Sequence, residues 1–114
     1  MEIETRVSGG VAILDLKGRL VLDDGEKLFL QKADEMIQRG HRRVLVNFAG
    51  VSEMDSTGVG VVVWKYITLK RQGGALKLLH LSARCRRILT TAKLLSVLAS
   101  FDSEAEAIES FSEI

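Results

Sequence analysis

The sequence predicts an α/β domain with a mixed, mostly parallel sheet of about five strands, the first two antiparallel, and about four helices. Segments with strand-like patterns alternate along the chain with segments of helical periodicity, which is typical of right-handed β-α-β crossovers. The chain has 114 residues, 46% of them hydrophobic, and contains no proline. Because this length supports one core and no flexible linker interrupts it, we expect residues 1–114 to form a single domain.

An antiparallel hairpin opens the predicted fold. Residues 2–7 and 11–17 are short strand-like segments, and Ser8-Gly9-Gly10 lies between them. Glycines between two such segments are typical of a tight hairpin turn. Gly18 is predicted to end the second strand and to begin a loop that runs to Asp24.

The next segment, residues 25–39, has helical periodicity. Its apolar residues recur at the spacing that lines one helix face: Phe29, Ala33, Met36 and Ile37. Asp23 and Glu26 loosely match the pair of side chains that caps a helix N-terminus, and Gly40 is a typical stop. We therefore expect the first helix between these signals.

Residues 44–48 form a nearly continuous apolar run, which predicts a buried central strand followed by a loop over residues 49–54. Residues 59–72 carry two conflicting signals, because the β-branched run Val61-Val62-Val63 favours a strand by propensity alone. The segment is too long for a typical strand, however, and its apolar residues keep helical spacing. We interpret it as a second helix that ends at Gly73.

The C-terminal part of the chain continues the alternation. Residues 75–79 predict a further buried strand, and Ser82 is placed to cap a third helix. One face of that helix carries Cys85, Ile88, Leu89 and Ala92. Residues 96–101 predict a short strand, and Ser103 with Glu106 forms a capping box before a last helix.

Composition excludes several classes of function. The formal net charge is +1, with 16 basic and 15 acidic residues spread along the chain, so no basic patch predicts a nucleic-acid partner. Cys85 is the only cysteine, which excludes an internal disulfide, fits a reducing cytoplasm and leaves no zinc site. The sequence has neither a long apolar run nor an N-terminal signal, so we expect no membrane span and no secretion.

Ser56 is the candidate functional residue. The sequence Asp55-Ser56-Thr57-Gly58 lies between a predicted buried strand and a predicted helix. Because functional groups of open α/β sheets collect outside the carboxyl ends of the strands, we expect this serine to be exposed on a rigid frame. Structural interpretations stay open beside this one: Ser56 or Asp55 caps the helix, and Asp55 either orients the serine or satisfies backbone donors.

Nearby residues have structural interpretations as well. A single aromatic residue on a helix is more often core than interface, so Trp64 and Tyr66 are expected in the core. Gly58 and Gly60 would allow a close approach of another molecule or relieve crowding between helix and sheet, and we favour packing for Gly60. Cys85 is expected to be an inert core thiol.

The segment Val51–Gly60 resembles the signature of the anti-sigma factor antagonist family, the bacterial STAS domains. The resemblance extends over almost the whole chain. Further matching segments are Gly18, Arg71–Gly74, Leu81-Ser82 and Phe101–Ala107. A single domain with the STAS-type fold is therefore implied.

The resemblance also implies a function. Such a protein is a cytoplasmic signalling protein that is not an enzyme and needs no cofactor. Unphosphorylated, it binds an anti-sigma factor and so releases a sigma factor for transcription. The anti-sigma factor is typically a serine kinase that uses ATP and magnesium; here it would phosphorylate Ser56 and switch binding off, and a serine phosphatase would reverse the step. Thr57 stays open as an alternative acceptor.

The resemblance and the position of the motif together suggest which residues bind the partner. The expected set is Asp23, Asp24, Met54, Asp55, Ser56, Thr57, Gly58 and Val59. The chain departs from the family pattern after Gly18, where many relatives carry an acidic residue and an aspartate and this chain has Arg19-Leu20-Val21-Leu22. The contacts expected there are either absent or moved to Asp23 and Asp24.

Two other functions compete with this one. A serine hydrolase needs a nucleophile motif such as Gly-x-Ser-x-Gly or a general base beside the serine, and the sequence shows neither. STAS domains also act as non-switching scaffolds of stress-signalling complexes or as accessory subunits of lipid-transport ATPases. Recovery of such an ATPase from native cytosol would favour that alternative.

Overall fold

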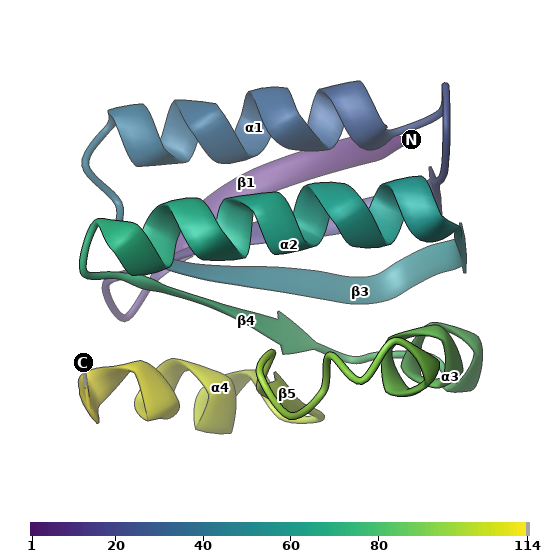
Figure 1. The fold of residues 1–114 in the computed structure, drawn as a ribbon. Coiled ribbons are helices and arrows are strands. Elements are labelled where there is room, and N and C mark those ends of the chain that lie inside the picture. The colour runs from purple at the N-terminus through teal and green to yellow at the C-terminus, as the bar shows by residue number, and fades with distance from the viewer. Residues whose placement is uncertain (114) are drawn as a thin grey trace.

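The computed structural model describes residues 1–113, which form one five-stranded sheet and four α-helices (Figure 1). The strands are β1 (Glu2–Ser8), β2 (Val11–Leu20), β3 (Arg43–Met54), β4 (Ala75–Leu79) and β5 (Ser100–Phe101). The helices are α1 (Glu26–Gln38), α2 (Ser56–Arg71), α3 (Ala83–Thr91) and α4 (Glu104–Ser110), and a 3-10 turn, Phe111–Glu113, follows α4.

The strands lie in the sheet in chain order, from β1 to β5. β1 and β2 are antiparallel, whereas β2, β3, β4 and β5 are parallel to one another. The predicted mixed sheet with an antiparallel first pair is therefore confirmed. Because parallel strands place their carboxyl ends at one edge of the sheet, β3 and β4 end on the same side, and α2 and α3 begin there.

Helices cover both faces of the sheet. On one face, α1 and α2 pack with α3 against alternate residues of the central strands, for example Leu14 and Val46. On the other face, α4 and the 3-10 turn place Ala107 and Phe111 against Ile13 and other alternate residues. The first halves of β2 and β3 are thus buried from both sides, which explains the continuous apolar runs Val11–Leu14 and Val44–Val46.

The hairpin turn is confirmed. Gly9 and Gly10 have φ angles of 58° and 78°, and Ser8 pairs with Val11 on either side of them. Two successive positive φ angles define the two-residue turn whose twist matches that of the strands, and glycine adopts them without strain.

Two strands are longer than predicted. β2 continues past Gly18 to Leu20, and the predicted loop over residues 49–54 is the second half of β3. The pairing between these strands shifts register after Asp15 and again after Gly18. At both shifts β3 contains one residue more than β2, so the irregularities are bulges of β3. Gly18 lies opposite the second bulge and does not end β2.

Two boundaries also differ from the prediction. α1 begins after Gly25, whose φ of 95° only glycine adopts freely, so Asp23 is not its N-cap; only the reverse contact exists, from the Asp23 N–H to Glu26 Oε1. β5 contains two residues, fewer than predicted, because the segment before it forms turns. In these turns the N–H groups of Val97 and Leu98 both donate to the Leu94 carbonyl.

The remaining helix predictions are confirmed. Residues 56–71 form a helix despite the valine run, because Val61 and Val62 are buried against the sheet. Ser82 and Ser103 cap α3 and α4 by accepting from the N–H groups of Cys85 and Glu106. Cys85 is fully buried as predicted, whereas Ala92, expected on the same face, is exposed at the end of α3.

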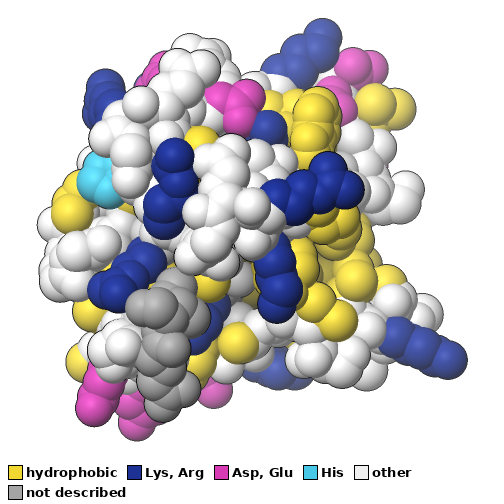
Figure 2. All heavy atoms as spheres, turned by 60° about the vertical axis from the view of Figure 1, so that its left-hand side comes forward, with side chains coloured by type: hydrophobic (Ala, Val, Ile, Leu, Met, Phe, Trp, Pro, Cys, Tyr) yellow, Lys and Arg dark blue, Asp and Glu magenta, His cyan; other side chains and the backbone are white. Residues whose placement is uncertain are grey.

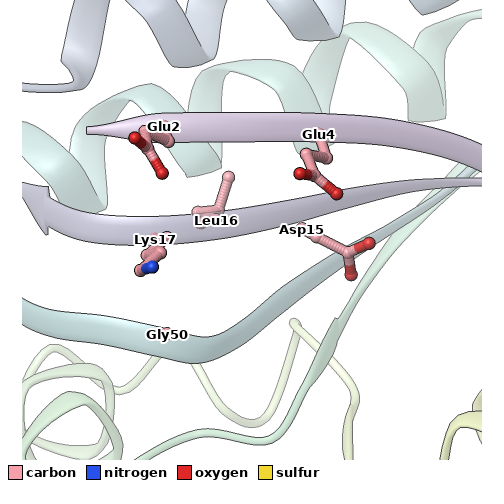
Figure 3. A pocket seen from close by; sticks show the side chains of 6 residues that line it. All are labelled: Glu2, Glu4, Asp15, Leu16, Lys17 and Gly50. Atoms are coloured by element: carbon pink, nitrogen blue, oxygen red, sulfur yellow. The ribbon is translucent and has the colours of Figure 1, made fainter.

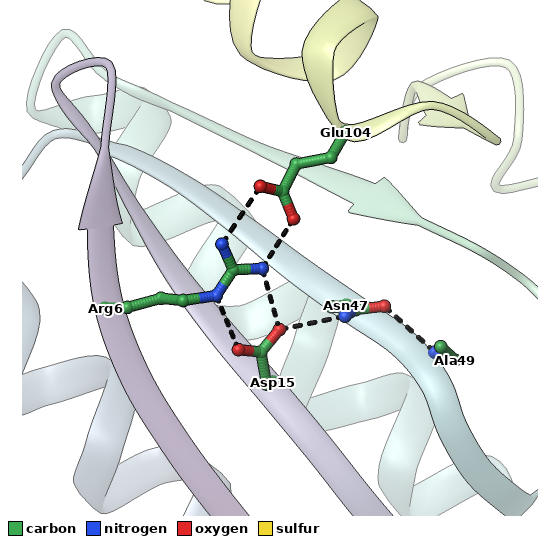
Figure 4. A network of polar contacts seen from close by, with 5 residues as sticks. All are labelled: Arg6, Asp15, Asn47, Ala49 and Glu104. Carbon is green, nitrogen blue, oxygen red and sulfur yellow. Dashed lines mark hydrogen bonds and ion pairs between the residues drawn. The ribbon is translucent and has the colours of Figure 1, made fainter.

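A polar network ties α4 to the strands (Figure 4). The Arg6 guanidinium on β1 donates to both oxygens of Asp15 on β2 and to both oxygens of Glu104. Asn47 on β3 donates to Asp15 as well, at 2.8 Å. The hydrogen bonds from Arg6 hold the pKa values of Asp15 and Glu104 below their usual ranges.

Charges on the surface are mixed. Figure 2 shows basic side chains separated by uncharged ones, with acidic groups towards the rim of that face. No helix within residues 1–113 has both the length and the apolar character that a membrane crossing requires.

Candidate functional site

Ser56 is the first residue of α2 and follows the end of β3 by two positions. Its side chain is exposed, and its hydroxyl makes no hydrogen bond to any other residue within 1–113. The carboxyl end of the sheet thus presents a free hydroxyl at the N-terminus of a long helix, as the sequence predicts.

Asp55 fixes the backbone around this serine. It is the N-cap of α2, and its Oδ1 accepts from the Gly58 N–H at 2.9 Å. Its Oδ2 accepts from the Leu22 N–H at 3.0 Å. The bonds from Leu22 and then from Gly58 hold the pKa of the Asp55 carboxyl below its usual range. Between the two interpretations of Asp55, these bonds favour the one in which it satisfies backbone donors.

The start of α2 lies directly against the end of β2. The Asp55 N–H donates to the Leu20 carbonyl at 3.4 Å, and a Cβ at Gly58 would lie 2.1 Å from that same oxygen. Gly58 therefore relieves crowding between helix and sheet. At Gly60 a Cβ would meet nothing within 4 Å, so the packing role favoured for Gly60 is wrong.

The loop after β2 lies beside the serine, because Asp55 bonds to Leu22. Leu22 is 60% exposed, and Asp23 is exposed next to it. Asp24 is half-buried, and its carboxylate lies 3.2 Å from the Met1 amino group and 3.8 Å from Arg19 Nη1. The structure thus brings the predicted Asp23 and Asp24 to the same edge as Ser56, with the charge of Asp24 already compensated.

The other predicted partner-binding residues differ in accessibility. Thr57 and Val59 are half-buried beside Ser56. Met54 is 3% exposed and Gly58 is buried, so these two residues support the surface around Ser56 and are not accessible to a partner.

Trp64 was expected in the core, and this prediction is wrong. Its side chain is 56% exposed on the outer face of α2, eight residues after Ser56 and four after Gly60. The buried face of α2 carries Val61, Val62 and Leu69, and Lys65 lies on it with its Nζ 2.6 Å from Asp34 of α1. Trp64, the residue before Lys65, therefore lies outside that face. Tyr66 is half-buried against the core.

Sequence reasoning therefore missed two residues of this surface, Leu22 and Trp64. The spacing of Ser56, Gly60 and Trp64 by four residues is a signal that places them on one helix face. The exposure of Leu22 had no signal in the sequence.

The described residues around Ser56 do not form the pair of nucleophile and base that a serine hydrolase uses. A nucleophilic serine needs a base bound to its hydroxyl, but both oxygens of Asp55 accept from backbone N–H groups and no other side chain within residues 1–113 hydrogen-bonds to Ser56. Within the same part of the chain, no three acidic, histidine or cysteine side chains gather in a way that could hold a metal ion.

Replacing Asp55 by alanine is expected to lower the free energy of unfolding by about 1–2 kcal/mol, because α2 loses its cap and the loop loses its anchor. The pKa of Asp55 is lower in the folded protein than in the unfolded chain, so its contribution is present above the unfolded pKa of about 4 and is lost as the pH falls through the folded value.

Urea unfolding at neutral and acidic pH measures this contribution. The difference between the native protein and Asp55→Ala should shrink as the pH falls below about 4. Asp102→Ala, which removes an exposed carboxylate elsewhere, serves as the control and should cost much less. A pH-independent deficit in Asp55→Ala would show that the charged hydrogen bonds are not its cause.

Comparisons with known proteins point to one family. The STAS domain family matches residues 2–107. The anti-sigma F factor antagonist of Paenibacillus polymyxa is 27% identical over 109 residues, which cover 95% of this chain and 92% of the relative.

Solved structures agree with this match. A candidate anti-sigma factor antagonist from Thermotoga maritima superposes with a TM-score of 0.90 at 22% identity, over 96% of this chain and 94% of that one. The anti-sigma factor antagonist SpoIIAA, 25% identical, superposes in its unphosphorylated form with a TM-score of 0.76 over 99% of this chain and 100% of that one. The phosphorylated form of SpoIIAA from Bacillus gives 0.74, also at 25% identity, over 96% and 98%.

Proposed function

Because the chain belongs to the STAS domain family, we propose that it is an anti-sigma factor antagonist, which binds an anti-sigma factor and so releases a sigma factor. In this proposal the anti-sigma factor is a serine kinase that uses ATP and magnesium and phosphorylates Ser56. Phosphorylation ends the binding, and a serine phosphatase restores it. The protein acts in the cytoplasm as a binding protein, without catalysis or a cofactor of its own.

The observation that carries the proposal is the accessibility of Ser56. A kinase must reach the hydroxyl, and this one is exposed, unbonded and held on the first turn of a helix. Thr57, the alternative acceptor, is half-buried. This difference supports Ser56 as the acceptor.

The partner would bind a docking surface that we define as Leu22, Asp23, Ser56, Thr57, Val59 and Trp64. Tryptophan is enriched among the residues that anchor protein interfaces, and Trp64 is more than half exposed. Leu22 adds exposed apolar area beside it. Asp23 adds a charged group at the rim. The family pattern has acidic residues directly after the glycine at position 18, and this chain does not. In this proposal, Asp23 makes the partner contacts that those acidic residues make in relatives.

The fold is suited to carry a phosphate at this position. The N-terminus of a helix has free N–H groups and a partial positive charge, which favour an anion there. The relative SpoIIAA exists in both an unphosphorylated and a phosphorylated form, which supports a modification that leaves the fold intact.

The proposal is tested by incubating the protein with ATP, magnesium and a STAS-partner kinase encoded in the same genome, and by mapping the phosphate with mass spectrometry. We expect one phosphate, on Ser56. Ser56→Ala should stay unmodified and still bind the kinase, whereas Thr57→Val should be modified normally. Phosphate incorporation that persists in Ser56→Ala would contradict the proposal.

A further inference from the structure

β1 is an open edge of the sheet. It is the first strand in the sheet order and, among the strands of residues 1–113, pairs with β2 alone, whereas the opposite edge, β5, is two residues long. Five of its seven residues are exposed, and Val7 is 55% exposed. A strand of this length leaves a row of unpaired N–H and C=O groups that another strand can bind.

The hairpin decides which backbone groups face outward. In a two-residue turn the flanking residues, here Ser8 and Val11, exchange hydrogen bonds, and every second pair after them does the same. Ser8, Arg6, Glu4 and Glu2 therefore bond to β2. The N–H and C=O groups of Ile3, Thr5 and Val7 point away from the sheet.

The two faces of β1 differ in chemistry. Ile3 packs with the core beneath α1, and side chains alternate along a strand, so Thr5 and Val7 share that face. Glu2, Glu4 and Arg6 lie on the opposite face, which carries α4 and the Arg6–Glu104 ion pair. There Glu4 lies opposite Asp15 on β2, so two carboxylates are neighbours across the strand pair, and both line one pocket (Figure 3).

Antiparallel pairing of β1 with a second β1 has few allowed registers. The outward N–H and C=O groups of the two strands can bond to each other only if each of Ile3, Thr5 and Val7 lies opposite one of these three residues in the other copy. Thr5 opposite Ile3 would place Glu4 opposite a second Glu4, and Thr5 opposite Val7 would place Arg6 opposite a second Arg6. Like charges directly opposite one another are unfavourable, so both of these registers are disfavoured.

The remaining register places Thr5 opposite Thr5. Ile3 then lies opposite Val7, and Glu4 lies opposite Arg6, twice each by symmetry. About six backbone hydrogen bonds form, and the exposed Val7 gains an apolar neighbour. Glu4 gains a cation on its open side, while Asp15 of its own chain stays opposite it on the other side.

We propose that two copies of this chain pair through β1 in this register and form a two-fold dimer with one continuous sheet. The partner strand is a second β1, because in this register Glu4 of each copy lies opposite Arg6 of the other. The contact is closed, since the two-fold axis uses both β1 edges and β5 is too short to extend the sheet. Because only one strand from each copy contributes, we expect a dimer that dissociates on dilution.

Cysteine substitution tests the register. In the proposed dimer the two Thr5 Cα atoms would be about 5.5 Å apart, within disulfide range, whereas the two Val7 Cα atoms would be about 14 Å apart. Thr5→Cys should therefore form a covalent dimer under mild oxidation, at least about tenfold faster than the exposed Val7→Cys. The native Cys85 is 0% exposed and does not compete. Equal rates for the two variants, or a Thr5→Cys protein that stays monomeric, would overturn the proposal.

Charge reversal supplies a second test that does not depend on disulfide formation. Glu4→Lys places a lysine opposite Arg6 of the other copy twice, but opposite Asp15 within its own chain. Its dimer should be weaker by about tenfold or more in sedimentation velocity, while its thermal stability is maintained or raised. Glu109→Lys, an exposed reversal on α4, is the matched control and should dimerise normally. Unchanged association of Glu4→Lys would refute the pairing. Neither test involves the anti-sigma partner, so failure here leaves the proposed function unaffected.

Discussion

Gly58→Ala is expected to lower the free energy of unfolding by about 3 kcal/mol, a large fraction of the stability of a domain of this size. A methyl group at this position would lie 2.1 Å from the Leu20 carbonyl oxygen and 2.9 Å from Met54 Cγ. The carbonyl belongs to the backbone of β2 and cannot turn aside, so α2 has to move away from the strand. That movement would also strain the hydrogen bonds that Asp55 makes to Leu20 and Leu22.

Gly60→Ala is the matched control on the same helix. A methyl group there meets no atom within 4 Å, and alanine is a better helix former than glycine. We expect it to raise the free energy of unfolding by about 0.5–1 kcal/mol. Urea unfolding followed by circular dichroism measures both variants. A loss of less than about 1 kcal/mol in Gly58→Ala would show that the close approach of α2 to β2 is not a constraint.

The order and types of the elements were predictable, because each depends on local periodicity. The valine run of α2 was assigned correctly since the length and spacing of the whole segment outweighed the strand propensity of three residues. The lengths of β2 and β3 were not predictable in the same way. They depend on pairing between residues far apart in sequence, such as Gly18 with Val51, and a bulge lets this pairing continue past a glycine that locally resembles an end.

The candidate site also combines features that local sequence predicts with features that depend on contacts between distant residues. The position of Ser56 follows from the chain order of strand and helix, and the structure exposes it there. The rotation of α2 was not predicted, because its buried face includes Lys65, whose charge is paired with Asp34 of another helix. Sequence patterns place tryptophan inside and lysine outside, and on this helix the two are reversed.

Phosphorylation of Ser56 is expected to weaken binding of the anti-sigma factor by about 30-fold to 1000-fold, which corresponds to about 2–4 kcal/mol. The phosphate adds a charge of about −1.5 to −2 at neutral pH. The neighbouring Asp55 is already an anion there, since its pKa lies below the usual range. A partner that covers the start of α2 would have to desolvate both groups. Titration calorimetry of the two forms measures the change in affinity.

Variants separate the charge from the loss of the hydroxyl. Ser56→Ala should bind with nearly native affinity, and Ser56→Asp should bind more weakly, by less than the phosphate because it carries one charge. Gln38→Glu adds a charge at the far end of α1 and should leave the affinity unchanged. If Ser56→Ala lost affinity as much as the phosphorylated form, the hydroxyl itself would be the contact and electrostatic repulsion would not be the switch.

The same charge is expected to have little effect on the fold, and this asymmetry is what makes the position suitable for a switch. The first turn of α2 favours an anion, and the Ser56 hydroxyl has no hydrogen bond within residues 1–113 that the phosphate would break. The melting temperature of the phosphorylated protein should therefore stay close to that of the unmodified one while the affinity falls. A large decrease in melting temperature would mean that binding is lost through unfolding of α2, and the proposed switch at the surface would be wrong.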